Sequence, residues 1–490
     1  MPSLTSSQHA DVEEKSPATI EASIDGSSDT SFDVASERRL KWKLDLFILP
    51  LVSIVAFFAY VGRSDLSNAK IAGLSDELKL TARDYSDAAT FFLIGYIIFQ
   101  LPGTLLVKKI GPPKQFFGAM VIWGVLTTVQ VCIHDFHALL IMRFFIGAAE
   151  AFVQGVVFYL SFWYTFDELA TRGAIYFSTS TLAGAFNGLI AYAVELDLDG
   201  TRGWRAWRWL FLIEGVLPIA FSFIVLVFLP DSPETVRFGF SSTEKKRLVE
   251  RARIANNSGV ERLEMKKIPL VLLDLRFWLY ALIAAGGHFC LESFSSFLPS
   301  LINDFGFDAV EAQAFTVIIY VVAFLGVIFW CRLADKTGQR GIVLIASTCF
   351  SILGYALLVG LTGRNGRFAA TAIAAFSVYA NIVIQLVWAS SNFVGYTRRG
   401  SVLAFMNIFP TLFSISATQA YSDPPYYRTG NAVALGLSVL VVIATIVLRW
   451  YLVRLNNVKK SLASSSDSDM MSAEDIEEVG DRHPNFFYYL

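Results

Sequence analysis

The sequence predicts an all-α membrane protein with twelve transmembrane helices in two pseudo-symmetric six-helix bundles. The chain has 490 residues, of which 54% are hydrophobic and only 17% charged, and its mean hydropathy is +0.51. A soluble chain would carry about a quarter charged residues. Apolar runs of about 20 residues, the length that crosses hydrocarbon as a helix, recur along the sequence instead.

Both ends of the chain are polar. Residues 1–40 are rich in Ser, Asp and Glu and contain no apolar run, so we expect a disordered cytosolic tail. No cleavable signal peptide is visible there, and the first spanning helix would direct insertion. Residues 456–490 have a similar composition, end in FFYYL, and are expected to form a second disordered cytosolic tail.

Two sets of six apolar runs flank a stretch rich in Lys and Arg. We expect an N-terminal bundle at 41–229, a basic cytosolic linker at 230–275 and a C-terminal bundle at 276–455. The expected spans lie near 44–62, 88–107, 115–133, 138–161, 174–194, 209–229, 277–301, 314–332, 341–361, 369–390, 401–420 and 432–453. Lys and Arg are more frequent in the connections on the side of the tails and linker, which predicts that both termini face the cytosol.

Polar residues interrupt the fourth apolar run. Arg143 and Glu150 lie about two turns apart on nearly the same helix face, and Gln154 follows one turn later. A charge inside a membrane helix costs roughly 2.5–3.5 kcal/mol on insertion scales, so it usually faces a polar cavity. We expect this helix to line a transport path, with Glu150 and Arg143 in proton coupling. The alternative is that Arg143 snorkels to the interface and Glu150 is a packing residue.

Several function classes lack their sequence signatures. No GxxxxGK[ST] loop is present for nucleotide phosphates, and no HExxH or GxSxG motif indicates an enzyme. The four cysteines form no CxxC pair. We therefore expect a carrier that is not an enzyme, has no cofactor and uses a proton gradient. His288 and Glu292 in the seventh span are either a proton relay or two polar groups that satisfy each other.

Several motifs in the right order make the chain resemble the major facilitator superfamily, and within it the fungal allantoate-permease branch of the anion:cation symporters. The resemblance covers essentially all of residues 40–455. It implies the major facilitator fold and import of organic anions such as allantoate, nicotinate, pantothenate and biotin. The motifs are GRSDLSNAKIAGL (62–74), FFLIGYIIFQLPGTLLVKK (91–109), RFFIGAAEAF (143–152), YLSFWYTFDELATRGAIYF (159–177), LAGAFNGLIAY (182–192), GWRAWRWLFLIEG (203–215), LPDSPE (229–234), WASSNFVGYTRR (388–399) and SDPPYYRTGNA (422–432).

The resemblance also implies site residues. In similar acid/proton symporters, an aspartate at the end of the first span and a glutamate in the fourth are protonatable, while an arginine binds the substrate carboxylate. Here the aspartate position is Gly62, the arginine is Arg63, and the family's asparagine position is Asp65. The resemblance therefore assigns Arg63 to the substrate and Glu150 to the proton. Asp65, close to the helix face of Gly62, is a candidate for the missing proton carrier.

Further departures and candidates follow along the chain. Gln100 replaces an expected Glu in the second span, and Gln154 replaces an expected Pro in the fourth, where it would contact substrate. Trp388 and Asn392, one turn apart on the tenth span, offer the substrate an aromatic wall and an amide.

Two short motifs predict a gating loop and a close contact between helices. RLADKTGQR (332–340) resembles the superfamily's cytoplasmic gating loop, in which Asp335 would cap a helix or pair with Arg340. Gly184 and Gly188 form a GxxxG motif, which predicts a close helix contact.

The function expected from these patterns is proton-coupled import of a small carboxylate. Its partners would be the substrate and the lipid bilayer, without nucleic acid, and the chain would act as a monomer in the plasma membrane. Export of a secondary metabolite from a fungal biosynthetic pathway and a transporter-like sensor are the alternatives. Exporters that exchange drugs for protons usually carry a GP motif in the fifth span, and residues 174–194 contain no proline.

Overall fold

The computed structural model describes residues 34–160, 162–164, 166–236, 239–256, 269–393, 396–463 and 486–490. Each of the twelve predicted spans coincides with a helix or, in the fourth case, with two short helices. The spans of the first half are α1 (Val34–Ala69), α3 (Ala82–Ile110), α4 (Pro112–Val129), α5 (Phe136–Ala151) with α6 (Val156–Leu160), α7 (Phe166–Asp197) and α8 (Ala206–Phe228). Those of the second half are α10 (Leu275–Asn303), α11 (Ala309–Thr337), α12 (Arg340–Gly360), α13 (Arg364–Asn392), α14 (Tyr396–Ala420) and α15 (Arg428–Ala463).

Short elements connect the spans. They are the π-helical turn Lys70–Leu74, α2 (Ser75–Leu78), the 3₁₀ turns Gln130–Cys132, Thr201–Gly203 and Pro269–Leu273, and α9 (Ser242–Asn256) in the linker. Eight of the described helices are long and apolar enough to cross a membrane by length and composition alone. The spans built by α3, α5 with α6, α7 and α14 are not among these eight. The all-helical membrane fold predicted from the sequence is thus confirmed.

Helix starts follow from local sequence. Thr81 begins α3 with a capping box, because its hydroxyl accepts from the backbone N–H of Asp84 and the Asp84 carboxylate accepts from that of Thr81. Asp308 and Glu311 repeat the arrangement at the start of α11. The boundaries of both predicted tails differ from the structure, since α1 begins at Val34 and α15 continues to Ala463. Most of the second predicted tail, residues 464–485, lies outside the described residues.

The fourth span is broken, which corrects the prediction of one continuous helix over 138–161. After Ala151, the N–H groups of residues 152–154 donate to carbonyls three residues back, and the next helix begins at Val156. The side-chain amide of Gln115 on α4 donates to the Phe152 carbonyl (2.8 Å) and to the Gly103 carbonyl of α3 (2.7 Å). The amide therefore satisfies a carbonyl that the break leaves free, and no proline is needed there.

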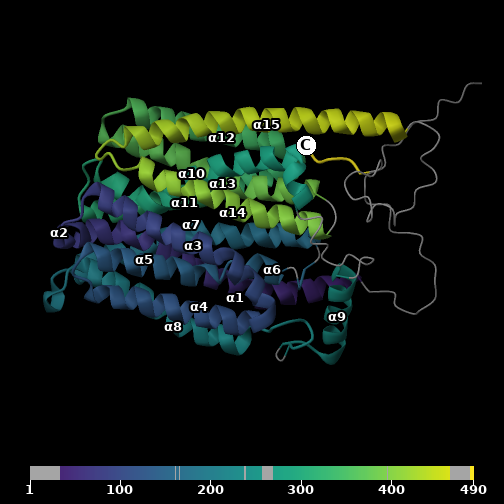
Figure 1. The fold of residues 1–490 in the computed structure, drawn as a ribbon, viewed down its shortest axis with the longest axis horizontal. Helices are drawn as coiled ribbons and strands as arrows, with labels where there is room; N and C mark the ends of the chain where they lie inside the picture. The colour runs from purple at the N-terminus through teal and green to yellow at the C-terminus, as the bar shows by residue number, and fades with distance from the viewer. Residues whose placement is uncertain are drawn as a thin grey trace, which may run out of the picture. The chain divides into compact units, whose positions relative to one another are not determined.

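Helices of the two halves lie side by side (Figure 1), and α7 packs on α11 while α3 packs on α14. Gly184 faces the ring of Tyr320, and Gly188 faces Val317, so the predicted close contact at the GxxxG motif is confirmed. Within the first half, a Cβ at Gly147 would lie 2.0 Å from the Phe92 carbonyl oxygen, which shows how closely α5 approaches α3.

We call the end of the helices where α10 begins and α15 finishes the tail end, and the opposite end, where α3 begins and α10 finishes, the far end. Hydrogen bonds join the halves at the far end. The Tyr85 hydroxyl donates to the Ser296 carbonyl, Ser67 and Ser300 share a 3.1 Å bond, and Thr90 and Thr418 share one of 2.7 Å. The halves are therefore in contact at the far end.

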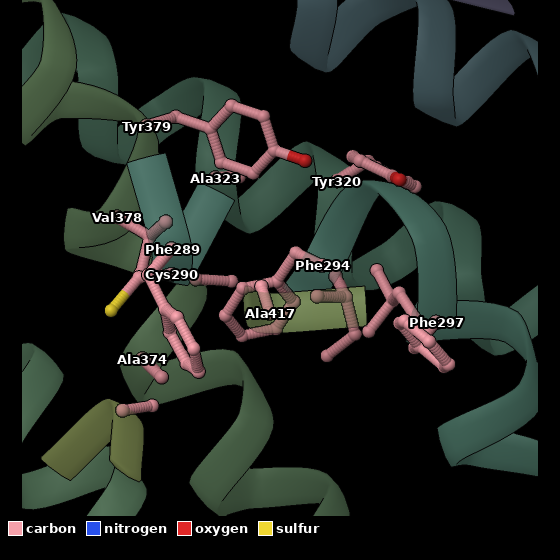
Figure 2. Packing of buried hydrophobic residues seen from close by; sticks show 14 of the residues in the cluster. Phe289, Cys290, Phe294, Phe297, Tyr320, Ala323, Ala374, Val378, Tyr379 and Ala417 are labelled. Atoms are coloured by element: carbon pink, nitrogen blue, oxygen red, sulfur yellow. The ribbon is translucent and has the colours of Figure 1, made fainter. Parts of the chain in front are cut away.

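The core of the second half is aromatic along α10 (Figure 2). Phe289, Phe294 and Phe297 project from this helix into space that α11, α13 and α14 also fill. The Phe297 ring also meets Tyr85 of the first half edge to face, with centroids 5.3 Å apart. This packing holds α10 in place beside α1 and α3, which carry most of the candidate site.

Candidate functional site

An arginine and a glutamate from different helices form the centre of the candidate site. Nε of Arg63 on α1 lies 3.5 Å from Oε2 of Glu150 on α5, and the Glu150 side chain is 1% exposed. The distance between these two atoms is longer than that of a typical hydrogen bond. The structure thus brings together the two residues that the resemblance assigned to substrate and proton.

Aromatic rings surround the guanidinium of Arg63. Its central carbon lies 4.6 Å from the ring centroid of Tyr96, 5.5 Å from that of Tyr60 and 5.9 Å from that of Phe92. Ring faces attract a cation without neutralising it. Arg63 therefore keeps its positive charge beside these rings. These rings were not singled out from the sequence, where they look like ordinary apolar residues.

Arg143 lies in a second buried group rather than beside Glu150 alone. Its side chain is 3% exposed, and its Nε and Nη2 have no hydrogen-bond partner among the described residues. It interacts electrostatically with Asp65, Tyr85, Glu150 and Glu214. The alternative that Arg143 snorkels to the interface is wrong, since the side chain is enclosed by protein.

Asp65 has partners from two further helices. Asn187 of α7 donates through Nδ2 to Asp65 Oδ1 (3.2 Å), and to the Ser64 hydroxyl (2.7 Å). The carboxyl of Glu214 on α8 is close enough to Asp65 to interact with it. Two neighbouring buried carboxyls repel each other when both are ionised. Glu214 was missed in the sequence, although a lone carboxyl in the apolar run of α8 is a usable signal.

A small cavity lies between the second half of the chain and the two buried groups, the Arg63–Glu150 pair and the group around Arg143. Its lining includes Arg63, Arg143 and Tyr85 from the first half and Glu292 and Ser296 from α10. Its volume is about 10 Å³, close to that of one water molecule. A molecule larger than water would not fit unless the cavity widened. Glu292 accepts a hydrogen bond from the Ser296 hydroxyl, so it is a further polar group of this cavity.

The remaining candidates lie elsewhere. Trp388 and Asn392 contact residues 486–490 at the tail end and are not in the cavity lining with Arg63. Gln154 is half-buried in the turn that breaks the fourth span. His288 Nδ1 donates to the Ala284 carbonyl (2.9 Å), and the hydrogen bonds of the described residues include none between His288 and Glu292.

The predicted gating residues Asp335 and Arg340 are not in the cavity lining either, and they interact electrostatically without a direct ion pair. Asp335 is exposed in the last turn of α11, and Arg340 donates instead to the Ser391 hydroxyl. The described ion pairs do not include these two residues. Across the described part of the chain, no cluster of His, Cys, Asp and Glu side chains is suited to a metal ion.

Comparisons with known proteins agree with this fold. The family model described as "Major Facilitator Superfamily" matches residues 52–418. The chain is 31% identical to "Uncharacterized transporter C1002.16c" of Schizosaccharomyces pombe, over 93% of this chain and 91% of the relative. It is 26% identical to the high-affinity nicotinic acid transporter of Saccharomyces cerevisiae, over 92% and 85% of the two chains.

The fold is also similar to a solved structure of a bacterial homologue of the human lysosomal transporter Spinster in an inward-facing conformation. The TM-score is 0.60 at 15% identity, covering 82% of this chain and 96% of that one.

Proposed function

Because the chain belongs to the Major Facilitator Superfamily, we propose that it is a proton-coupled symporter of a small organic anion. Its relatives are membrane transporters, and so is this chain. The single observation that carries the finer proposal is the buried Arg63–Glu150 pair at a cavity between the halves. Substrate anion binds Arg63, and the transported proton binds Glu150.

Charge balance explains the coupling. With Glu150 ionised, the pair with Arg63 is neutral overall. When an anion binds Arg63 and a proton binds Glu150, the site is neutral again. Binding either alone leaves a net charge in a site enclosed by protein, which costs several kcal/mol. The halves can therefore rearrange readily when the site is empty or fully loaded, and this restriction is what couples the two fluxes.

The substrate proposal rests on the chemistry around Arg63. A planar guanidinium takes a carboxylate through two parallel hydrogen bonds. The rings of Tyr60, Phe92 and Tyr96 would contact the organic part of a small, flat acid. Similarity to a nicotinic acid transporter supports a small carboxylate as the substrate class.

In this proposal, the buried group of Arg143, Asp65 and Glu214 affects the number of protons transported per substrate. Asp65 and Glu214 share a proton beside Arg143, and gain or loss of that proton changes the charge near the cavity. A second transported proton would bind here. Measurement of protons taken up per substrate in Asp65→Asn tests this, and an unchanged ratio would remove Asp65 from the coupling.

Flux in oriented vesicles tests the whole proposal. Right-side-out and inside-out vesicles would be given a panel of labelled carboxylates with an imposed pH gradient. We expect uptake into right-side-out vesicles that increases when the outside is acidic. Flux only in the export direction would favour an exporter, and binding without flux would favour a sensor; either result contradicts the proposal.

A further inference from the structure

Five residues near the end of the chain are held at the tail end of the second half. The segment Phe486–Leu490 was predicted to be disordered, but its backbone is bonded on both sides. Asn456 of α15 accepts from the Tyr488 N–H (2.8 Å) and donates to the Tyr488 carbonyl (2.9 Å). Asn392 of α13 does the same for Tyr489, at 2.8 and 2.9 Å. This segment is called the docked segment below.

The two asparagines act as a backbone clamp. A side-chain amide that both donates to and accepts from one residue copies the pairing of a neighbouring strand. Successive residues of an extended chain point their backbone N–H and C=O groups to opposite sides. This explains why Tyr488 bonds to Asn456 of α15 and Tyr489 bonds to Asn392 of α13. Both asparagines bond only to the backbone of the segment, so this arrangement suits binding of an extended peptide.

Further contacts favour a peptide with aromatic side chains. The Trp388 Nε1 donates to the Tyr489 carbonyl (2.9 Å), and Lys459 Nζ donates to the Phe486 carbonyl (2.7 Å). Lys459 also lies 4.4 Å from the ring centroid of Tyr488. Contacts between cations and rings favour aromatic side chains at this position.

Arg276 of α10 completes the site. Its guanidinium carbon lies 4.9 Å from the Tyr488 ring and 5.1 Å from the Phe393 ring, so it contacts rings of both the segment and the helix bundle. Tyr488 is 6% exposed. Phe487 and Tyr489 remain 42% and 54% exposed. The docked segment thus buries one main ring and leaves two open to the surroundings, which is a modest interface for a covalently attached chain.

We propose that the surface formed by Arg276, Trp388, Asn392, Asn456 and Lys459 is a binding site for an extended aromatic peptide, and that the docked segment is its reversible internal ligand. Attachment to the same chain keeps the local concentration of the segment high, so weak binding is sufficient. Binding and release need no change in the segment's covalent structure.

Docking joins helix ends within the second half. It ties the tail end of α13 to α10 and α15 through the contacts above. In rocking carriers, helices rearrange in each cycle. A bound segment therefore resists movement of α13 relative to α10 and α15, and its release speeds a cycle in which these helices move against one another. This part rests on transport activity in general and does not depend on proton coupling.

Peptide binding tests the site without any transport. A protein truncated after residue 485 would be purified and titrated with a fluorescent, acetylated FFYYL peptide. We expect saturable binding, and about tenfold weaker binding to the same truncation with Asn456→Ala, because two hydrogen bonds are lost. A peptide with alanine at the position of Phe487 is the matched control and should bind nearly as well. Absence of saturable binding would overturn the proposal.

Flux tests the consequence. We expect the truncated protein to exchange substrate several-fold faster than the full chain, per folded molecule, and the added peptide to restore the slower rate. The full-length variant Asn456→Ala should also be faster, which guards against an effect of truncation on folding. An unchanged rate in both variants would show that the segment does not restrain the cycle.

Discussion

A side chain at residue 62 would meet the carboxylate of Glu150, because a Cβ built on Gly62 lies 3.0 Å from Oε1. The first span thus leaves room for the fourth-span carboxylate beside Arg63. The family pattern that the chain resembles has an aspartate at this position. Its absence here gives Glu150 close access to α1 and leaves Glu150 as the carboxylate paired with Arg63.

Restoring that aspartate is expected to disrupt the pair. Gly62→Asp places a second carboxylate against Glu150, and two like charges in one buried site are unfavourable. We expect at least a tenfold fall in uptake at neutral external pH, with partial recovery at acid pH, where one carboxyl is protonated. The control is Gly62→Asn, which has nearly the size of aspartate but no charge and should keep more uptake at neutral pH. Uptake equal to that of the original chain would contradict the packing argument.

Arg63→Lys is expected to raise the KM for the anion by tenfold or more. Lysine keeps the charge but loses the planar fork that binds a carboxylate through two bonds. Initial rates of uptake across substrate concentrations provide the measurement. Arg83→Lys, at an exposed position in the first turn of α3, is the matched control. If Arg63→Lys changes the maximal rate and leaves KM unaltered, Arg63 is not the substrate ligand.

Glu150→Gln is expected to separate substrate movement from the pH gradient. The amide is close in shape to a protonated carboxyl, so anion exchange should persist while accumulation driven by the gradient is lost. Counterflow and gradient-driven uptake are measured on the same vesicles. Asp76→Asn, at an exposed position in α2, should leave both activities unchanged. Gradient-driven accumulation by Glu150→Gln would rule out Glu150 as the proton carrier.

Asp274 makes a stabilising contribution that depends on pH. Burial by itself raises the pKa of Asp274, but hydrogen bonds and charge from Arg276 and the charge of Arg398 outweigh burial and hold that pKa below its ordinary value of 3.8. A depressed pKa in the folded state contributes stability above the unfolded value and loses it as the pH falls through the folded value.

Asp274→Asn should therefore destabilise the protein at neutral pH by about 1.5–3 kcal/mol, the range for hydrogen bonds to charged groups. The difference should shrink as the pH falls below about 4. Thermal unfolding in detergent over that pH range is the measurement, with Asp76→Asn as the control. A difference that is constant across the range would show that the carboxylate charge is not responsible.

The contact between α3 and α5 should be sensitive to a single methyl group. A Cβ at Gly147 would lie 2.0 Å from the Phe92 carbonyl oxygen, a backbone atom that cannot move alone. We expect Gly147→Ala to lower the free energy of unfolding by about 1–3 kcal/mol. Gly118→Ala should be neutral or stabilising, because alanine favours a helix by up to about 1 kcal/mol. Equal effects of the two variants would contradict the close contact.

Helix number and order could be predicted from the sequence because each span must satisfy its own backbone hydrogen bonds in lipid. Glu150 could be singled out because its charge is unusual within an apolar run, whereas Arg63 was assigned by the resemblance to a known family. The break after Ala151 could not be predicted in this way. It depends on the amide of Gln115, a residue from another helix that the local pattern does not connect with Phe152.

The remaining site residues also depend on contacts with other helices that the local sequence does not show. Trp388 and Asn392 have the side chains expected of a substrate pocket, yet they contact residues nearly a hundred positions further along the chain. Glu214 and the rings around Arg63 were missed because their importance comes from neighbours on other helices.

The sequence by itself determined the membrane-spanning helices and the isolated charge of Glu150, because burial in lipid makes a long apolar run and a single charge within it easy to recognise. The resemblance to a known family added Arg63. Only the tertiary structure decided which polar groups meet, how small the cavity is and what the docked segment contacts. Those relationships depend on distances between helices, and a linear pattern does not contain them.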